Sequence, residues 1–107
     1  MSFGIRLTRD AERDLSDIFE YIALVLLSPE NAAGQLGRLE HGIASLENMP
    51  ERFRVYEREP WTSRGLRIMP VDNYLVFYIP NREAEMVTIL RVMYGGRDVE
   101  RRFLSDR

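Results

Sequence analysis

The chain has 107 residues, of which 45% are hydrophobic and 30% are charged. This composition is typical of one compact domain with its own core and excludes wholesale disorder. The absence of cysteine excludes disulfides, thiolate nucleophiles and cysteine-ligated zinc, and it is consistent with a reducing cytoplasm. The longest apolar run, residues 21–27, is too short to span a bilayer, and the N-terminus lacks the layout of a signal peptide. We therefore expect a single cytoplasmic domain over residues 1–107 that does not enter a membrane.

The charged residues are unevenly distributed and chemically biased. Fifteen basic residues against seventeen acidic ones give a net charge of −2, and every basic residue is arginine. The acids lie mostly in the first half of the chain, whereas nine of the arginines lie from Arg58 onward. A net negative chain argues against binding nucleic acid over its whole surface but not against a local arginine patch. Arginine suits planar, bidentate contacts with carboxylate or phosphate, although a GC-rich genome would give the same bias.

The first half of the chain predicts a strand followed by two helices. Apolar residues alternate over residues 3–7, as in a strand with one buried face. Thr8 can cap a helix over residues 9–27, in which apolar residues recur every three or four positions. Ser28 and Pro29 form a second helix start. Because the turn between them is so short, the two helices must run antiparallel, as a hairpin that needs a sheet to cover its apolar stripe.

Two features in the middle of the chain have both a structural and a functional interpretation. His41 is the only histidine and lies among polar helix positions, without a second ligand at metal-binding spacing, so we expect a solvated side chain. Residues 51–63 mix charged residues with Phe53, Tyr56 and Trp61, which predicts an irregular arm pinned to the sheet edge by its aromatic side chains. Interleaved arginine and aromatic residues could also stack on bases or fill a groove in a partner.

The second half predicts an antiparallel meander over residues 65–71, 73–79 and 86–94, because each run is rich in strand-forming residues and turn residues separate the runs. Alternation sorts each run into two faces. We expect one set to face the helices: Leu66, Ile68, Leu75, Phe77, Ile79, Leu90 and Val92. We expect the other set to face away: Arg67, Met69, Tyr74, Val76, Tyr78, Arg91 and Met93. Since the helices can cover only one face, Arg67 and Arg91 would share an open, concave face with the tyrosines, where they could meet an anion.

The tail after the meander predicts one more short element. Gly95 and Gly96 end the last strand, and residues 98–104 predict a short basic helix anchored by Val99 and Phe103. The expected fold class is therefore α+β. It has an N-terminal strand, an antiparallel helical hairpin packed on one face of a mainly antiparallel sheet of about four strands, and a short C-terminal helix.

This order of elements and three sequence motifs resemble the RelE/ParE superfamily of bacterial toxins from type II toxin–antitoxin pairs. The motifs are residues 8–15 (TRDAERDL), residues 65–78 (GLRIMPVDNYLVFY), and residues 89–92 (ILRV) followed by residues 96–98 (GRD). Their pattern is similar to the ParE side of the superfamily. The resemblance covers essentially the whole chain, and it implies a RelE/ParE-like fold and the toxin of a plasmid-stabilisation module.

The superfamily has two activities. RelE-like members cut mRNA in the ribosomal A site with the message's own 2′-hydroxyl as nucleophile, whereas ParE-like members poison DNA gyrase without catalysis of their own. RelE-like cleavage needs cations near the phosphate and groups that transfer protons. Here Leu75 follows Tyr74 where RelE-type sequences carry a basic residue, lysine is absent, and Met93 precedes Tyr94 where YoeB-like toxins have histidine. The resemblance therefore favours gyrase poisoning, with a ribosome-dependent mRNA endonuclease as the alternative.

Either activity would use the arginine-rich surface. The residues expected to act in a nuclease are Arg67, Arg91, Tyr94 and Arg97, with Glu57 or Glu59 as a possible base. The residues expected to bind a target are Arg64, Arg67, Tyr74, Tyr78, Arg91, Arg97 and Arg101. No cofactor and no metal is expected with either activity.

The same surface predicts the partners. An arginine-lined open face suits an acidic, partly disordered antitoxin segment that folds on contact, so we expect a cognate acidic antitoxin in a toxin–antitoxin hetero-oligomer. The target would be DNA gyrase, contacted by tail residues 91–104, or the ribosome with its mRNA. A third interpretation is an inactive family member, or a plain interaction domain, in which Arg67 and Arg91 merely pair with Glu57, Glu59 or Asp98.

Overall fold

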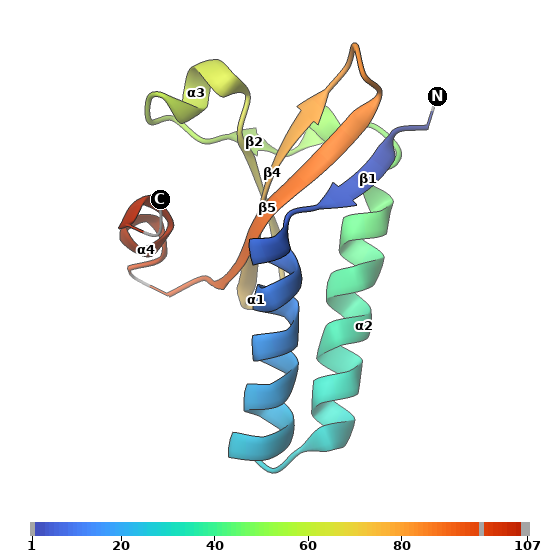
Figure 1. The fold of residues 1–107 in the computed structure, drawn as a ribbon, viewed down its shortest axis with the longest axis vertical. Coiled ribbons are helices and arrows are strands. Elements are labelled where there is room, and N and C mark those ends of the chain that lie inside the picture. Colours follow the sequence, from blue (N-terminus) through green and yellow to red (C-terminus); the bar gives the residue numbers. More distant parts are fainter. Residues whose placement is uncertain (1, 97, 106–107) are drawn as a thin grey trace.

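An N-terminal strand leads into a helical hairpin, and the second half of the chain forms most of the sheet (Figure 1). The computed structural model describes residues 2–96 and 98–105. The helices are α1 (Arg9–Glu20), α2 (Pro29–Ser45), α3 (Trp61–Arg64) and α4 (Val99–Ser105), with a π-helical turn η1 (Tyr21–Val25) and a 3-10 turn η2 (Pro50–Arg52). The strands are β1 (Gly4–Leu7), β2 (Arg54–Val55), β3 (Arg67–Val71), β4 (Tyr74–Asn81) and β5 (Met86–Tyr94). These elements confirm the predicted α+β class.

The strands form one sheet in the order β1-β5-β4-β3-β2. β1 pairs parallel with β5, while the other neighbours pair antiparallel. Parallel strands need a long connection, which the helical hairpin and the meander supply here. β2 lies in the stretch that was predicted to be an irregular arm, so the sheet has five strands where the sequence predicted about four.

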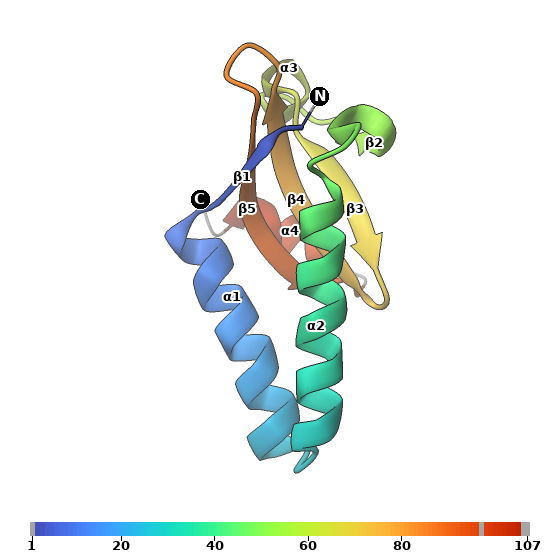
Figure 2. The same ribbon diagram turned by 90° about the vertical axis from the view of Figure 1, so that its right-hand side faces the viewer.

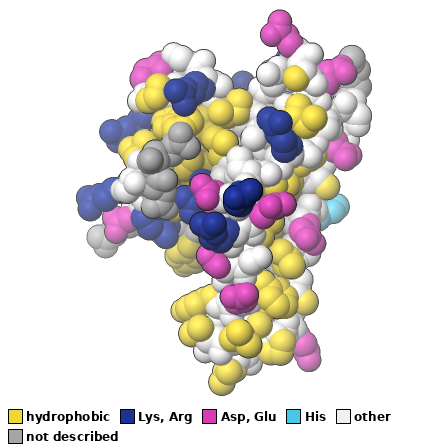
Figure 3. Space-filling view, viewed as in Figure 1, with side chains coloured by type: hydrophobic (Ala, Val, Ile, Leu, Met, Phe, Trp, Pro, Cys, Tyr) yellow, Lys and Arg dark blue, Asp and Glu magenta, His cyan; other side chains and the backbone are white. Residues whose placement is uncertain are grey.

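α1 and α2 run antiparallel side by side, as predicted, and their connected end extends beyond the sheet (Figures 1 and 2). Thr8 caps α1, since its Oγ1 accepts the N–H of Ala11 at 3.1 Å. The regular α-helix ends at Glu20, earlier than predicted, and the chain continues as η1. At this end of the hairpin apolar side chains gather on the surface (Figure 3): Tyr21, Leu24, Val25, Leu26 and Leu27. The hairpin end therefore presents an apolar surface outside the core.

Both faces of the sheet are covered. The hairpin packs on a cluster formed by Met69, Val76, Tyr78, Val87, Ile89 and Val92. On the opposite side, the arm around α3 and the helix α4 pack on a second cluster formed by Leu66, Ile68, Phe77 and Met93 (Figure 2). The predicted faces of β3 and β4 are therefore wrong. Arg67, Tyr74, Val76 and Tyr78 lie on the hairpin side, and Leu66, Ile68, Leu75, Phe77 and Ile79 lie on the α4 side.

A β-bulge in β5 explains why alternation also failed in that strand. Phe77 pairs with Arg91, but the next residue, Tyr78, pairs with Ile89. Leu90 is therefore an extra residue in β5, and the residues on either side of it change face. As a result Leu90 packs with the α4-side cluster and Val92 with the hairpin-side cluster, although the sequence predicted one common face for them.

The predicted tail helix is confirmed as α4. Its anchors Val99 and Phe103 are buried, and the ring of Phe103 stacks on the ring of Phe77 with centroids 4.4 Å apart. This packing closes the face that was predicted to be open and concave. Arg97 lies outside the described residues. None of the helices in the described part of the chain combines the length and apolar character needed to cross a bilayer.

The buried Tyr78 predicts how stability depends on pH. Its Oη donates a hydrogen bond to the carbonyl oxygen of Pro50 at 2.6 Å, and burial raises the pKa of Tyr78 to about 12 from an ordinary value of 10.0. The unfolded chain releases this proton near pH 10, while the folded chain retains it. We therefore expect the contribution of Tyr78 to the free energy of unfolding to be intact below pH 10 and to fall by about 2–3 kcal/mol between about pH 10 and 12.

The variant Tyr78→Phe tests this assignment by urea unfolding, followed by circular dichroism from pH 7 to 12. Loss of the hydrogen bond is expected to lower the free energy of unfolding by about 1 kcal/mol at pH 7, and loss of the titrating group makes the alkaline decline shallower. Tyr21→Phe, at an exposed tyrosine, is the matched control. An alkaline slope equal to that of the wild type would contradict the assignment.

Candidate functional site

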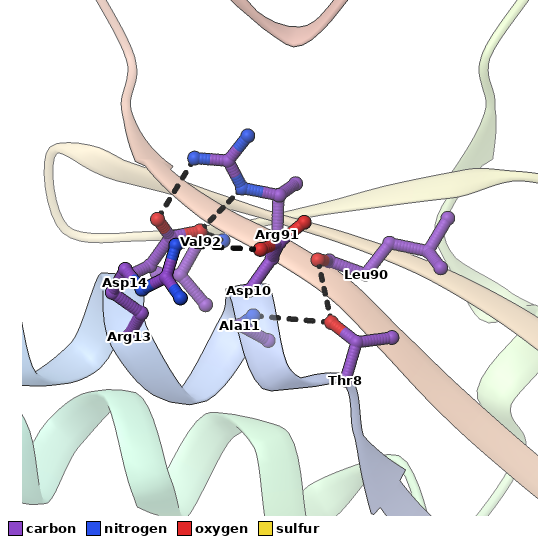
Figure 4. Close-up of polar contacts among 8 residues, drawn as sticks. All are labelled: Thr8, Asp10, Ala11, Arg13, Asp14, Leu90, Arg91 and Val92. Carbon is purple, nitrogen blue, oxygen red and sulfur yellow. Dashed lines mark hydrogen bonds and ion pairs between the residues drawn. The ribbon is translucent and has the colours of Figure 1, made fainter. Parts of the chain in front are cut away.

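Arg91 is held by a carboxylate that the sequence analysis did not identify (Figure 4). Its Nε lies 2.7 Å from Oδ2 of Asp14 and its Nη2 lies 2.9 Å from Oδ1, so the pair is bidentate. The same Oδ2 accepts the backbone N–H of Val92 at 2.9 Å. Both side chains are largely buried, with exposed fractions of 17% for Arg91 and 11% for Asp14. The cation that was expected on an open face is thus neutralised inside the fold.

Thr8, the N-cap residue of α1, binds the backbone of β5 at the bulge. The backbone N–H of Thr8 donates to the carbonyl oxygen of Ile89 at 3.0 Å, and its Oγ1 donates to that of Leu90 at 2.9 Å. We call Thr8, Asp14, Arg91 and Val92 together the α1–β5 clamp. It satisfies backbone groups that a bulge would otherwise leave without partners. No signal in the sequence links Asp14 to Arg91, because polar residues on a helix are ordinary and the two lie far apart along the chain.

Arg67 is bound elsewhere and does not join Arg91. Its Nη1 donates to the carbonyl oxygens of Glu51 at 2.9 Å and Phe53 at 2.7 Å. The predicted shared arginine face is therefore wrong. The predicted acidic partners are wrong for Arg91 too, since it pairs with Asp14. Glu59 instead accepts the backbone N–H of Ser63 at 3.1 Å, and Glu57 is an exposed residue of the arm.

The three tyrosines of the predicted site have different environments. Tyr78 is fully buried and bonded to Pro50, so it offers no surface to a macromolecule. Tyr74 is half-buried and meets Tyr94 edge to face, with ring centroids 5.7 Å apart and an interplanar angle of 82°. Tyr94 is 55% exposed. These two rings line an open cleft between the sheet and the hairpin.

Exposed arginines gather instead on the arm and on α4, over the second cluster. We call this surface the basic face; its residues are Arg54, Arg58, Arg64, Arg101 and Arg102. Arginine side chains are concentrated on the side of the molecule where α3 and α4 lie (Figure 3). The pKa of Tyr56 reports that arm and tail are neighbours: burial raises it, Glu100 of α4 raises it further, and Arg58 and Arg54 of the arm lower it. The sequence analysis named Arg64 and Arg101 as target-binding residues, and it gave a partner contact as one interpretation of the interleaved arginine and aromatic residues of the arm.

Some of these arginines are already positioned by local contacts. The guanidinium of Arg64 lies 5.1 Å from the ring centre of Trp61, which is buried against Phe103. Arg102 donates to the carbonyl oxygen of Tyr94 and so ties α4 to the end of β5. Two of the five arginines of the basic face are therefore held in place by contacts with the folded chain.

The described residues contain no group of three His, Cys, Asp or Glu side chains that could hold a metal ion. His41 is exposed on α2, as expected for a solvated side chain.

The sequence model of the family described as the ParE toxin of the type II toxin–antitoxin system parDE matches residues 5–99. No curated protein sequence matches the chain significantly. A chain of the chromosomal ParDE system from P. aeruginosa has a similar fold, with a TM-score of 0.74 and 19% identity over 89% of this chain and 98% of that one.

Two further solved structures share the fold. One is the toxin–antitoxin complex RelBE2 from Mycobacterium tuberculosis, with a TM-score of 0.63 and 24% identity over 88% of this chain and 99% of that one. The other is the archaeal RelE–RelB complex from Pyrococcus horikoshii, with a TM-score of 0.60 and 18% identity over 91% of this chain and 99% of that one.

The α1–β5 clamp predicts a large effect for Asp14. Replacing it with alanine leaves the guanidinium of Arg91 buried without its carboxylate and is expected to lower the free energy of unfolding by about 3–5 kcal/mol, measured by urea unfolding. Arg13→Ala breaks only the exposed contact between Arg13 and Asp10 at 3.9 Å and is expected to change stability by less than about 0.5 kcal/mol.

If Asp14→Ala fails to fold, the double variant Asp14→Leu/Arg91→Met provides a second test of the clamp. Replacing both ions by apolar groups removes the stranded charge, so this variant is expected to be more stable than Asp14→Ala. A loss below about 1 kcal/mol in Asp14→Ala would show that Arg91 finds another partner and that the clamp is not needed.

Proposed function

Because the chain belongs to the ParE toxin family of type II toxin–antitoxin systems, we propose that it inhibits growth by poisoning DNA gyrase. The observation that carries this proposal is the basic face on α3, its arm and α4, which offers cations to a partner without assembling a catalytic site. Clustered arginines steer and orient a large partner and do not need to transfer protons.

The positions of the arginines disfavour mRNA cleavage. A phosphodiester cleavage site needs cations aimed at one phosphate, together with groups that move protons. Arg91 is bound to Asp14 and Arg67 to the carbonyl oxygens of Glu51 and Phe53, so neither is aimed at a common substrate position. A nuclease that used Arg91 would have to break a largely buried ion pair first.

We further propose that a cognate acidic antitoxin binds the basic face. Solved neighbours of this fold include a RelBE2 complex and a RelE–RelB complex of toxin and antitoxin, which supports an antitoxin partner here. An acidic segment that folds on contact would place carboxylates against Arg64, Arg101 and Arg102. Binding there would cover the same cations that gyrase needs, so the antitoxin would neutralise the toxin by occupying its contact surface.

The deciding experiment adds the purified protein to a gyrase supercoiling reaction and, in parallel, to translating ribosomes followed by mapping of message ends. We expect loss of supercoiling and intact message. Cleaved message with untouched supercoiling would overturn the proposal in favour of the RelE-like endonuclease.

Expression of the chain without a partner is expected to stop growth. Normal colony counts at comparable protein levels would instead favour an inactive family member.

Two matched double variants test the basic face. Arg64→Ala/Arg101→Ala removes two of its cations and is expected to raise the protein concentration that half-inhibits gyrase by about tenfold, which corresponds to about 1.4 kcal/mol of binding free energy. Arg9→Ala/Arg13→Ala removes the same charge from α1 and is expected to leave inhibition unchanged. Equal losses of inhibition in both variants would mean that only the overall charge of the protein matters. No loss in either variant would show that the basic face does not contribute to gyrase inhibition.

A further inference from the structure

A cleft of about 650 Å³ opens between the exposed end of the hairpin and the sheet, on the side of the molecule that the proposed function leaves unused. Its walls come from α1, η1, α2, the start of β4 and the end of β5. We call it the tyrosine cleft and define it by Tyr21, Tyr74, Tyr94, Asp17, Ile22 and Leu26. Its size is that of an ordinary ligand or side-chain pocket.

Three aromatic rings shape this cleft. Tyr74 and Tyr94 stand edge to face at 5.7 Å, and Tyr21 approaches from the hairpin. Burial raises the pKa of Tyr74, and the nearby hydroxyls of Tyr94 and Tyr21 raise it further, so the three side chains lie close together. Tyr21 and Tyr94 remain 53% and 55% exposed. Ring faces that are open to solvent attract cations through their quadrupole, and a planar guanidinium stacks on them especially well.

The carboxylate of Asp17, at the rim of the cleft, makes the cleft selective for a positively charged group. Asp14, one turn earlier on α1, is neutralised by Arg91. Asp72, which precedes the cleft residue Asn73 in the chain, accepts from Arg38 at 2.7 Å and from Gln35 at 3.0 Å. The side chain of Asp17 makes no hydrogen bond or ion pair within the part of the chain that the structure describes, although it also borders a shallow pocket shared with Arg13 and Arg91. Its negative charge therefore has no direct ion-pair partner among the described residues and lies beside three tyrosine rings.

Apolar side chains surround this charge. Ile22 and Leu26 form part of the wall, and Leu24 and Leu27 extend the apolar surface along the hairpin end, where hydrophobic side chains cover the lower part of the molecule (Figure 3). A contiguous exposed apolar patch beside a polar rim marks a protein interaction surface. A fitting partner must therefore combine apolar side chains with a cation.

We propose that the tyrosine cleft binds an arginine side chain of a partner protein, carried on a segment that sets it between apolar residues. The guanidinium lies among the rings of Tyr21, Tyr74 and Tyr94 and pairs with Asp17, while the flanking apolar residues cover the hairpin end. This surface has the opposite preference to the basic face, which takes acidic groups. The inference goes beyond the proposed function and does not depend on which target the toxin inhibits.

The test uses the full chain and three synthetic peptides of equal length, identical except for a central Arg, Gln or Glu between leucines, with binding read by fluorescence anisotropy. We expect the Arg peptide to bind at least about tenfold more tightly than the Gln peptide, and the Glu peptide to bind least well. Asp17→Asn and Tyr94→Leu are each expected to remove most of the preference for Arg while leaving Gln-peptide binding unchanged. Asp10→Asn, on the same helix but outside the cleft, is the matched control.

Several outcomes overturn the proposal. These are equal binding of the three peptides, tightest binding of the Glu peptide, no binding at about millimolar concentration, or an Arg preference that survives Asp17→Asn. A wild-type dimer that Asp17→Asn converts to a monomer would assign the cleft to a second copy of this chain and likewise overturn it. Because gyrase inhibition is read separately, failure of the cleft and failure of the proposed function are distinguishable.

Discussion

The contact on which the rest of the structure depends is the α1–β5 clamp. A bidentate ion pair joins Asp14 to Arg91, and the same carboxylate holds the backbone of Val92. Removing two charges from water is costly, and their mutual attraction repays that cost only when the geometry is good and the remaining polar atoms are satisfied. Here the bidentate geometry and the third bond of the carboxylate, to the backbone of Val92, meet that condition. The bonds of Thr8 satisfy the carbonyl oxygens of Ile89 and Leu90 beside the pair. The clamp therefore fixes where α1 crosses β5 and keeps the bulge at Leu90 in place.

The bulge has consequences for both surfaces of the molecule. By inserting Leu90, it turns Val92 toward the hairpin and Met93 toward α4. It thereby directs the end of β5, where Tyr94 meets Tyr74 across the sheet and its carbonyl oxygen accepts from Arg102 of α4. The same strand end thus supports the tyrosine cleft on one side and the tail of the basic face on the other. A local change of register sets the geometry of two sites that lie apart.

Sequence periodicity predicted the elements well and their orientation poorly. The apolar stripes along α1 and α2, the cap at Thr8 and the anchors Val99 and Phe103 depend on local spacing and were confirmed. The end of the first predicted helix was wrong, because Val25 and Leu26 are exposed. The faces of β4 could not be predicted, because its alternating sets are both apolar: Val76 and Tyr78 pack on the hairpin, and Leu75 and Phe77 pack toward α4. A strand that is buried on both faces carries no alternation signal to show which side meets the helices. The partner of Arg91 could not be predicted from the sequence either, because the pairing with Asp14 depends on a tertiary contact.

The arginines illustrate how charge counts translate into surfaces. A net charge of −2 suggests a nearly neutral protein, yet the structure gives its surfaces different excesses of charge. Exposed arginines gather on the arm and on α4, and α1 carries Asp10, Asp14 and Asp17 along its length. Two of these three carboxylates have arginine partners within the described residues, so only the charge of Asp17 stands beside the tyrosine rings without one. A partner that engaged both surfaces would need acidic and basic segments in a fixed order, because like charges placed opposite one another cost several kcal/mol. Opposed surfaces of this kind select for the arrangement of charges along a partner, a property that the composition of either chain does not reveal.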